Sequence, residues 1–187
     1  MSLLKLSQVA CWRGGRLLFE GLDLTLSAGE AMLVSGPNGS GKSSLLRLVA
    51  GLLPPLGGKV VAGRSALADE RTALDPELPL ARALAFWASS DGAIAPALEA
   101  VDLAHLADVP VRLFSTGQPQ GRASLARVTL SGAPLWLLDE PANGLDRASV
   151  DRLSALIAAH LATGGAVLAA SHQPLGGAAW RRLELEP

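Results

Sequence analysis

One eight-residue stretch limits what this chain can fold into more than any other part of the sequence. Residues 36–43 fit the pattern G-x-x-x-x-G-K-[ST], which is typical of a phosphate-binding loop. An apolar run at 31–34 predicts a buried strand before it, and 44–50 predict a helix that ends at Gly51. The loop residues are Gly36, Pro37, Asn38, Gly39, Ser40, Gly41, Lys42 and Ser43.

The chemistry of this loop points to a nucleotide. Its glycines let successive backbone N–H groups turn inward around phosphate oxygens, which a Cβ atom would obstruct. The helix start adds unpaired N–H groups and about half a positive charge, so Ser44 is a further candidate for nucleotide binding. We expect Lys42 to reach the β- and γ-phosphates and the Ser43 hydroxyl to hold Mg²⁺. The alternative is a glycine-rich turn before a helix.

Composition excludes several classes of protein. Hydrophobic residues make up 49% of the 187 residues and charged residues 18%, which favours one globular domain over a disordered chain. The net charge of −1 offers no broad basic face, so no nucleic-acid partner is expected. Cys11 is the only cysteine, which excludes an internal disulfide and fits a cytosolic protein. No apolar run reaches the ~18 residues of a membrane helix, so we expect any membrane connection to come through another subunit.

A second group of residues stands at the end of a later apolar run. Residues 135–138 predict a buried strand, and Asp139 and Glu140 follow it. In a parallel sheet, ligands bind at the carboxyl ends of the strands. Asp139 would then lie beside the phosphate loop and orient Mg²⁺ through its water shell, and Glu140 could polarise an attacking water. Without the loop, the same three letters Asp-Glu-Pro would indicate an ordinary strand-ending turn.

The rest of the chain alternates strands and helices around these two groups. Pro, Ala and Leu dominate from about residue 66 to 118, which predicts a helical lobe inserted into the core. Strands are expected at 3–10, 17–19, 22–26, 31–34, 59–62, 134–139 and 166–170, and helices at 80–87, 93–101, 104–107, 123–130 and 147–161.

Further motifs follow in a fixed order. Phe114-Ser115-Thr116-Gly117-Gln118 precedes a helix that contains Leu125-Ala126-Arg127, Asn143-Gly144-Leu145-Asp146 follows the acidic pair, and Ser171-His172 closes the last buried strand. With the phosphate loop and the acidic strand, this series resembles the ATPase subunits of ABC transporters over nearly the whole chain. The resemblance implies one α/β domain over 1–187. Its core would be of the P-loop NTPase type, a mixed sheet flanked by helices, with an N-terminal antiparallel β subdomain and an inserted α-helical subdomain.

The resemblance also implies a shared active site. In this family, two ATPase subunits close head to tail on two ATP molecules. Ser115 and Gly117 would present a hydroxyl and a backbone N–H to the γ-phosphate in the partner, and Gln118 would support them. Asp146 would cross the interface between the subunits.

The catalytic set implied by the resemblance is Lys42, Glu140 and His172. His172 would contact the γ-phosphate and hold Glu140 and the attacking water in line. A lone histidine after an apolar strand is more often structural, but its place in the series favours this role. His160, on a predicted helix, is expected to be a packing or surface residue.

Three stretches are most similar to the heme-exporter ATPase of cytochrome c maturation: 133–141, 115–118, and the ending Ser171-His172-Gln173-Pro174-Leu175. This resemblance implies a peripheral subunit on the cytoplasmic face of the bacterial inner membrane, docked to an integral membrane subunit. ATP hydrolysis would release a heme-loaded chaperone, so heme would be an indirect partner. The alternatives are the ATPase of another small ABC exporter, or a nucleotide-binding regulatory module that hydrolyses ATP weakly.

The sequence departs from the family pattern at several positions. Glu70 stands six residues before Pro76, where the family has a glutamine that bridges Mg²⁺; it is a candidate metal ligand or, equally, a solvated acid. Arg13 stands where a tyrosine usually stacks on adenine, and a guanidinium can also stack on a base. The stretch 118–127 is one residue longer than usual, which a bulge or a later helix start would absorb.

Overall fold

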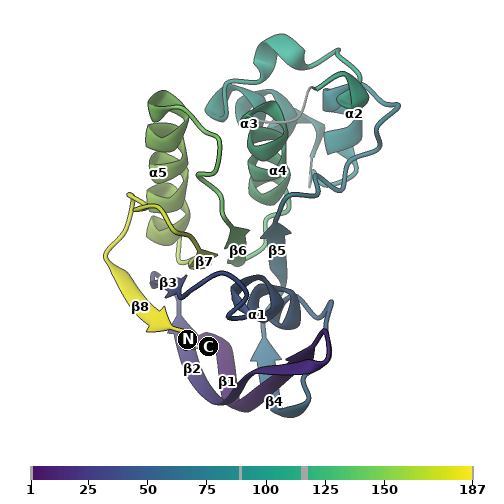
Figure 1. The fold of residues 1–187 in the computed structure, drawn as a ribbon. Helices are drawn as coiled ribbons and strands as arrows, with labels where there is room; N and C mark the ends of the chain where they lie inside the picture. The colour runs from purple at the N-terminus through teal and green to yellow at the C-terminus, as the bar shows by residue number, and fades with distance from the viewer. Residues whose placement is uncertain (1, 89, 115–117, 187) are drawn as a thin grey trace.

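The chain folds around two β-sheets. A computed structural model describes residues 2–88, 90–114 and 118–186. One sheet has three antiparallel strands and the other has five (Figure 1). The strands are β1 (Ser2–Arg13), β2 (Arg16–Ser27), β3 (Ala31–Ser35), β4 (Gly57–Ala62), β5 (Ser65–Ala68), β6 (Leu135–Asp139), β7 (Ala166–Ala170) and β8 (Trp180–Glu184).

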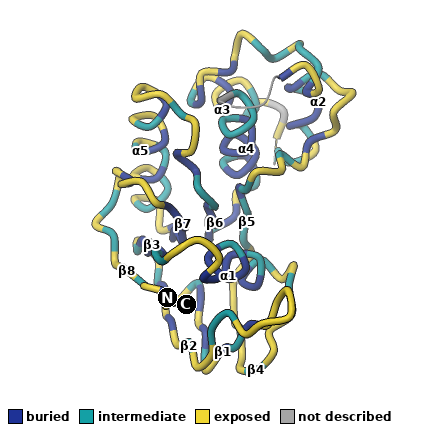
Figure 2. The backbone as a smooth tube through the Cα atoms, viewed as in Figure 1, coloured by how far each residue is buried: buried dark blue, intermediate teal, exposed yellow. Residues whose placement is uncertain are grey.

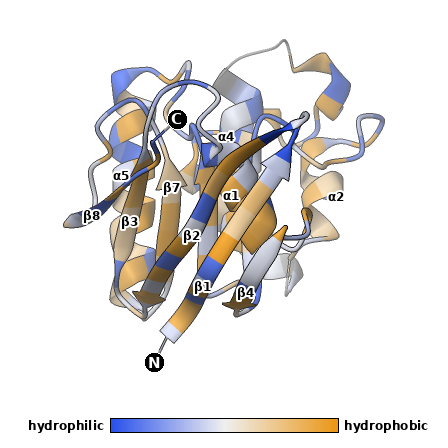
Figure 3. Ribbon diagram, turned by 60° about the horizontal axis from the view of Figure 1, so that its bottom comes forward, coloured by the Kyte–Doolittle hydropathy of each residue, from blue (hydrophilic) through white to orange (hydrophobic). Residues whose placement is uncertain are grey.

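Helices cover both faces of the five-stranded sheet. They are α1 (Lys42–Val49), α2 (Leu80–Ala85), α3 (Ile94–Ala100), α4 (Gln118–Leu130) and α5 (Arg147–Ala162), with short 3-10 turns at 91–93, 104–106 and 111–113. Helix α1 lies between the two sheets, whose apolar faces pack against it (Figure 3). Helix α5 packs on the other face of the large sheet, and α2, α3 and α4 gather at one end (Figure 1). No helix within the described ranges is long and apolar enough to cross a membrane.

The large sheet has the strand order β5-β6-β7-β3-β8 and is parallel throughout, where a mixed sheet was predicted. Its central strands are continuous apolar runs because both of their faces are covered, as Figure 2 shows in dark blue. In β6, Leu135 and Leu137 face α1, while Trp136 and Leu138 face α5. The residues next along the chain are Asp139 and Glu140, so this packing fixes where the acidic pair emerges.

Sequence patterns missed two strands and divided a third. Strand β5 lies inside the stretch assigned to the helical lobe from about residue 66, yet it pairs with β6, so the helices begin beyond it. Strand β8 adds to the edge of the sheet beside β3. Strand β2 runs unbroken through 17–26, where two strands were predicted; Gly21 adopts φ +64° beside an irregular pairing with β1.

The start of α4 differs from the sequence prediction. A bulge or a later helix start was expected to absorb the extra residue, but the helix begins at Gln118 and continues without a break. Pro119 therefore lies in the first turn, where its missing N–H costs no hydrogen bond. Gly121 lies close to the segment after β6: a Cβ atom there would sit 3.9 Å from Leu145 Cδ2.

His160 is a packing residue, which confirms one of the two expectations for it. Its ring stacks on Trp136 with the ring centroids 3.9 Å apart and the planes 10° from parallel. Burial lowers the pKa of His160, so the neutral imidazole is favoured. On the other side the ring touches Gly165, where an added Cβ would collide with Nε2 and Cε1. The backbone at Gly165 and the indole of Trp136 therefore hold the imidazole in place.

Gly165→Ala should push the imidazole off Trp136, because φ at Gly165 is ordinary and the cost is steric. We expect the free energy of unfolding to fall by about 1–3 kcal/mol. In a His160→Ala background the same change should cost almost nothing, since the ring it strikes is gone. Urea denaturation of the four proteins measures this coupling, and equal costs in both backgrounds would contradict the stack.

Candidate functional site

The phosphate loop connects the end of β3 to the start of α1, and two of its glycines are required by contacts. Gly41 adopts φ +105° at the helix start, and a Cβ atom there would lie 3.1 Å from Leu18 Cβ and 3.1 Å from the Phe19 ring. Gly36 adopts φ +140°, and a Cβ would collide with the Leu185 carbonyl beside β8. The loop is therefore held against β2 on one side and the C-terminal segment on the other.

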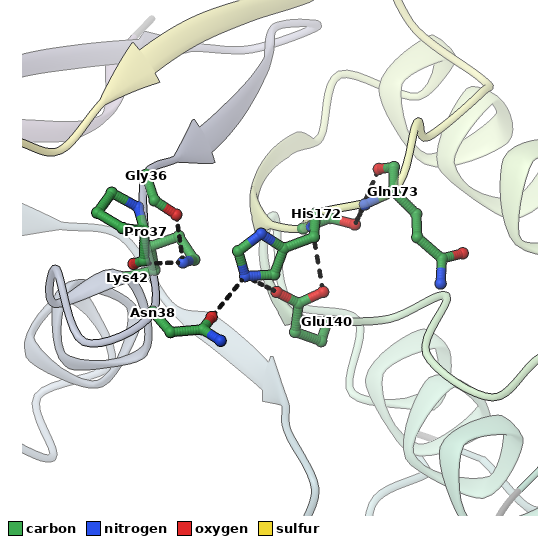
Figure 4. Close-up of polar contacts among 8 residues, drawn as sticks. Gly36, Pro37, Asn38, Lys42, Glu140, His172 and Gln173 are labelled. Carbon is green, nitrogen blue, oxygen red and sulfur yellow. Dashed lines mark hydrogen bonds and ion pairs between the residues drawn. The ribbon is translucent and has the colours of Figure 1, made fainter.

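Lys42 is folded back onto the loop that carries it (Figure 4). Its Nζ donates hydrogen bonds to the carbonyl oxygens of Gly36, at 2.8 Å, and Pro37, at 3.1 Å. The side chain is buried, so the ammonium depends on these two acceptors. Phosphate oxygens carry full charge and accept stronger hydrogen bonds than carbonyls do. The ammonium can therefore exchange these carbonyls for a phosphate.

Glu140 and His172 meet across the ends of β6 and β7. The Glu140 backbone has φ +48°, an uncommon value for a residue with a side chain, and its N–H donates to the Ala170 carbonyl at 2.8 Å. The His172 N–H donates to Glu140 Oε2 at 3.2 Å. His172 Nε2 lies 3.5 Å from Glu140 Oε1 and 3.0 Å from Asn38 Oδ1 (Figure 4). The imidazole thus bridges the carboxylate and the phosphate loop.

An open cleft of about 640 Å³ contains these groups, a size typical of ligand sites. Glu140 and His172 line this cleft, and so do Arg13 and Arg16 of the β1–β2 hairpin. The residues that line it are Arg13, Gly14, Arg16, Leu18, Asn38, Gly39, Gly41, Lys42, Ser43, Ser44, Glu140, Asn143, His172 and Gln173.

A second cavity of about 440 Å³ shares Ser43 and Glu140 with the cleft and is lined also by Asp139 and Glu70. Burial raises the pKa of Asp139, and the nearby Glu140 adds to this, while Ser43 and Arg47 lower it. No cluster of three or more His, Cys, Asp or Glu side chains suited to a metal occurs in the described parts of the chain.

The structure brings most of the predicted site residues together. The loop residues Asn38, Gly39 and 41–44 line the cleft with Arg13, Glu140 and His172, and Ser43, Asp139 and Glu70 line the second cavity. Gly36, Pro37 and Ser40 make contacts within the loop. The Gly36 and Pro37 carbonyls accept hydrogen bonds from Lys42, and the Ser40 hydroxyl lies beside Gly36.

Among the predicted interface residues, Asp146 is described by the structure and lines neither cavity. Asp146 is exposed and caps α5, where its side chain accepts a hydrogen bond from the Ser149 N–H at 2.8 Å. This bond lowers the pKa of Asp146. Ser115, Gly117 and the side chain of Gln118 lie outside the part of the chain that the structure describes.

Sequence reasoning missed several residues that line the two cavities. Arg47 lies one helical turn after Ser43 and pairs with Asp69 at 3.3 Å, so the spacing of four within α1 could have placed it at the site. Arg16 mirrors Arg13 across a two-glycine turn, a symmetry visible in the sequence. Asn143 and Gln173 belong to motifs noted in the sequence, but neither was predicted as a site residue.

Comparisons with known proteins agree with this geometry. The family model described as ABC transporter matches residues 19–143. A cytochrome c biogenesis ATP-binding export protein CcmA from Sphingopyxis alaskensis is 59% identical over 175 residues, which cover 91% of this chain and 90% of that protein. The protein of the same description from Zymomonas mobilis is 54% identical over 184 residues, covering 95% and 82%.

Solved structures share the fold. The ATP-binding subunit of an ABC transporter matches with a TM-score of 0.83 and 24% identity, over 91% of this chain and 79% of that one. A dimeric ATP-binding cassette in a post-hydrolysis state, bound to ADP and phosphate, matches with a TM-score of 0.80 and 21% identity, over 91% and 88%. Together with the family match and the relatives, these likenesses show that the chain belongs to the ABC transporter ATP-binding proteins and, among them, to the CcmA export proteins of cytochrome c biogenesis.

Proposed function

We propose that this chain binds ATP with Mg²⁺ in the cleft and hydrolyses it, as the motor subunit of a heme exporter in cytochrome c biogenesis. The observation that carries the proposal is the contact between Glu140 and His172 beside the phosphate loop. A carboxylate held by a histidine next to a buried, exchangeable lysine is suited to phosphoryl transfer to water. Hydrolysis would drive release of a heme-loaded chaperone.

Different residues of the chain bind the phosphates, accept the proton and hold the metal. Lys42 and the loop N–H groups hold the phosphates and balance the charge that develops on them. Glu140 accepts a proton from the attacking water, and His172 keeps the carboxylate in place. Ser43, Asp139 and Glu70 would hold Mg²⁺, which supplies positive charge to the β- and γ-phosphates.

A second copy of the chain would complete the site. Within the described part of the chain, the cleft is lined by the phosphate loop, the β1–β2 hairpin and the segments that follow β6 and β7. We assign a further side to Ser115, Gly117 and Gln118 of a second copy, closed head to tail. Asp146 would contribute from the same face, through its backbone or after leaving its cap.

The membrane subunit needs a docking surface on this chain, and we assign it to a groove of about 640 Å³ beside α1 and the lobe. Leu52 is exposed there, and Arg127 lies over the Trp87 ring, with its guanidinium carbon 4.8 Å from the ring centroid. Arg71 adds a further cation. An apolar and basic groove suits an amphipathic segment of an integral subunit, which would place this chain on the cytoplasmic face of the bacterial inner membrane.

Glu140→Gln should lower the ATPase rate at least about 100-fold, because an amide cannot accept the proton. ATP affinity should stay unchanged, since Lys42 and the loop remain. Steady-state phosphate release with the membrane subunit present measures the effect, and Glu99→Gln, at an exposed position of α3, is the control. Equal rates for wild type and Glu140→Gln would contradict the motor function and favour a weakly hydrolysing regulatory module.

Asp139→Asn should raise the melting temperature of the nucleotide-free protein at pH 7 by about 2 °C. Since burial raises the pKa of Asp139, the folded state holds its proton more tightly than the unfolded chain. Ionisation therefore costs stability at neutral pH, and the cost disappears as the pH falls through the raised pKa. The gain from Asp139→Asn should shrink in the same pH range.

Asp146→Asn is the control for this experiment. The pKa of Asp146 is lowered, so its charge favours the folded state and its loss should not raise the melting temperature at pH 7. Scanning calorimetry of both variants gives the comparison. A lower melting temperature for Asp139→Asn would show that its carboxylate stabilises the apoprotein and would contradict a net cost of its ionisation.

Glu70→Ala should raise the Mg²⁺ concentration for half-maximal ATPase about tenfold if Glu70 supports the metal. Glu70→Gln should stay near wild type, because its amide oxygen can also bind Mg²⁺. Glu77→Ala removes an exposed acid that pairs with Arg112 and serves as the control. An unchanged Mg²⁺ requirement in Glu70→Ala would make Glu70 a solvated acid.

A further inference from the structure

Two arginines face the phosphate loop from the tip of the β1–β2 hairpin. Arg13 and Arg16 are register partners across a turn formed by Gly14, φ +60°, and Gly15, φ +81°. Two left-handed residues in a two-residue loop make a tight hairpin that fixes the flanking register. Directly paired residues of antiparallel strands lie on the same face, so both guanidinium groups reach the cleft.

The two guanidinium groups bind different parts of the loop. Arg13 Nη1 donates to the Ser44 hydroxyl at the start of α1, at 3.3 Å. Arg16 Nη2 donates to the Gly39 carbonyl, in the middle of the loop, at 2.6 Å. Arg16 therefore contacts the phosphate loop itself, while Arg13 contacts the first turn of α1.

Arg16 has no acidic partner within the ranges that the structure describes, and the Gly39 carbonyl is its one hydrogen-bond acceptor there. A neutral carbonyl is a modest acceptor for a full positive charge. Lys42 is in the same situation, with Nζ held by the Gly36 and Pro37 carbonyls. Both cations are thus hydrogen-bonded to backbone carbonyls of the phosphate loop.

We propose that Arg16 is a triphosphate-binding residue that leaves the Gly39 carbonyl and donates to a phosphate oxygen of the bound nucleotide. This inference rests on the proposed ATP site and adds a cation to it. The exchange is favourable because a phosphate oxygen carries a negative charge that the Gly39 carbonyl lacks, and a guanidinium can donate two parallel N–H···O bonds to a phosphate. The reach needed is short, since Gly39 is itself part of the phosphate loop.

The test is the affinity of the full chain for ATP and for inorganic tripolyphosphate, which carries the anion without the base. Arg16→Gln should weaken both about tenfold, the loss of one charge-assisted hydrogen bond. Arg16→Lys should recover part of the lost affinity, because lysine restores the positive charge but cannot donate two parallel hydrogen bonds as a guanidinium can. Arg64→Gln is a matched control: Arg64 is also exposed and donates to a glycine carbonyl, that of Gly132, at 2.6 Å, away from the cleft.

The outcomes separate this proposal from the site itself. Unchanged affinities in Arg16→Gln overturn it, and so does a loss for ATP alone, which would assign Arg16 to the base. Failure of tripolyphosphate to compete with ATP in wild type also overturns it, because a cleft that holds phosphates through its cations must bind the bare anion. If Lys42→Ala lowers ATP affinity while Arg16→Gln does not, the ATP site stands and only the role of Arg16 fails. If wild type binds no ATP, the proposed function fails as well.

Discussion

The parallel pairing of β3, β6 and β7 is the constraint on which the site depends. Parallel strands place their carboxyl ends at one edge, so the phosphate loop, Glu140 and His172 meet there although they are far apart in the chain. A hydrogen bond from the Glu140 N–H to the Ala170 carbonyl joins two of these ends directly. Apolar packing of β6 on α1 and α5 keeps the edge rigid.

Electrostatic balance at this edge is incomplete without a ligand. Lys42 and Arg16 rest on neutral carbonyls, while Asp139 carries a raised pKa through burial. Lys42 and Arg16 line the cleft, Asp139 lines the second cavity, and Glu140 lines both. A triphosphate with a divalent cation would neutralise both kinds of charge at once, and ligand binding would then add stability to the folded state.

The sequence predicted the elements that are buried on both faces and failed where tertiary contacts decide. Strands β3, β6 and β7 are continuous apolar runs, and the phosphate loop and acidic pair follow from their local spacing. Strand β8 is Trp-Arg-Arg-Leu-Glu, largely exposed at a sheet edge, and no alternation identifies it. The contact of Arg16 with Gly39 joins residues 23 apart in the sequence, and the pKa of Asp139 depends on the burial that the fold creates. The roles predicted for the site residues, including Glu70 and Asp146, stay predictions.

The left-handed backbone at Glu140 has a consequence for the history of such chains. A residue with a side chain costs free energy at φ +48°, and glycine or asparagine would adopt this conformation more easily. The side chains that would be most stable at this position therefore lack a carboxylate that could act as a base. A related protein that no longer needed to hydrolyse ATP could replace this carboxylate and become more stable. Its cleft could still bind nucleotide. The role of base that we propose for Glu140 would account for a carboxylate at a position where it costs stability.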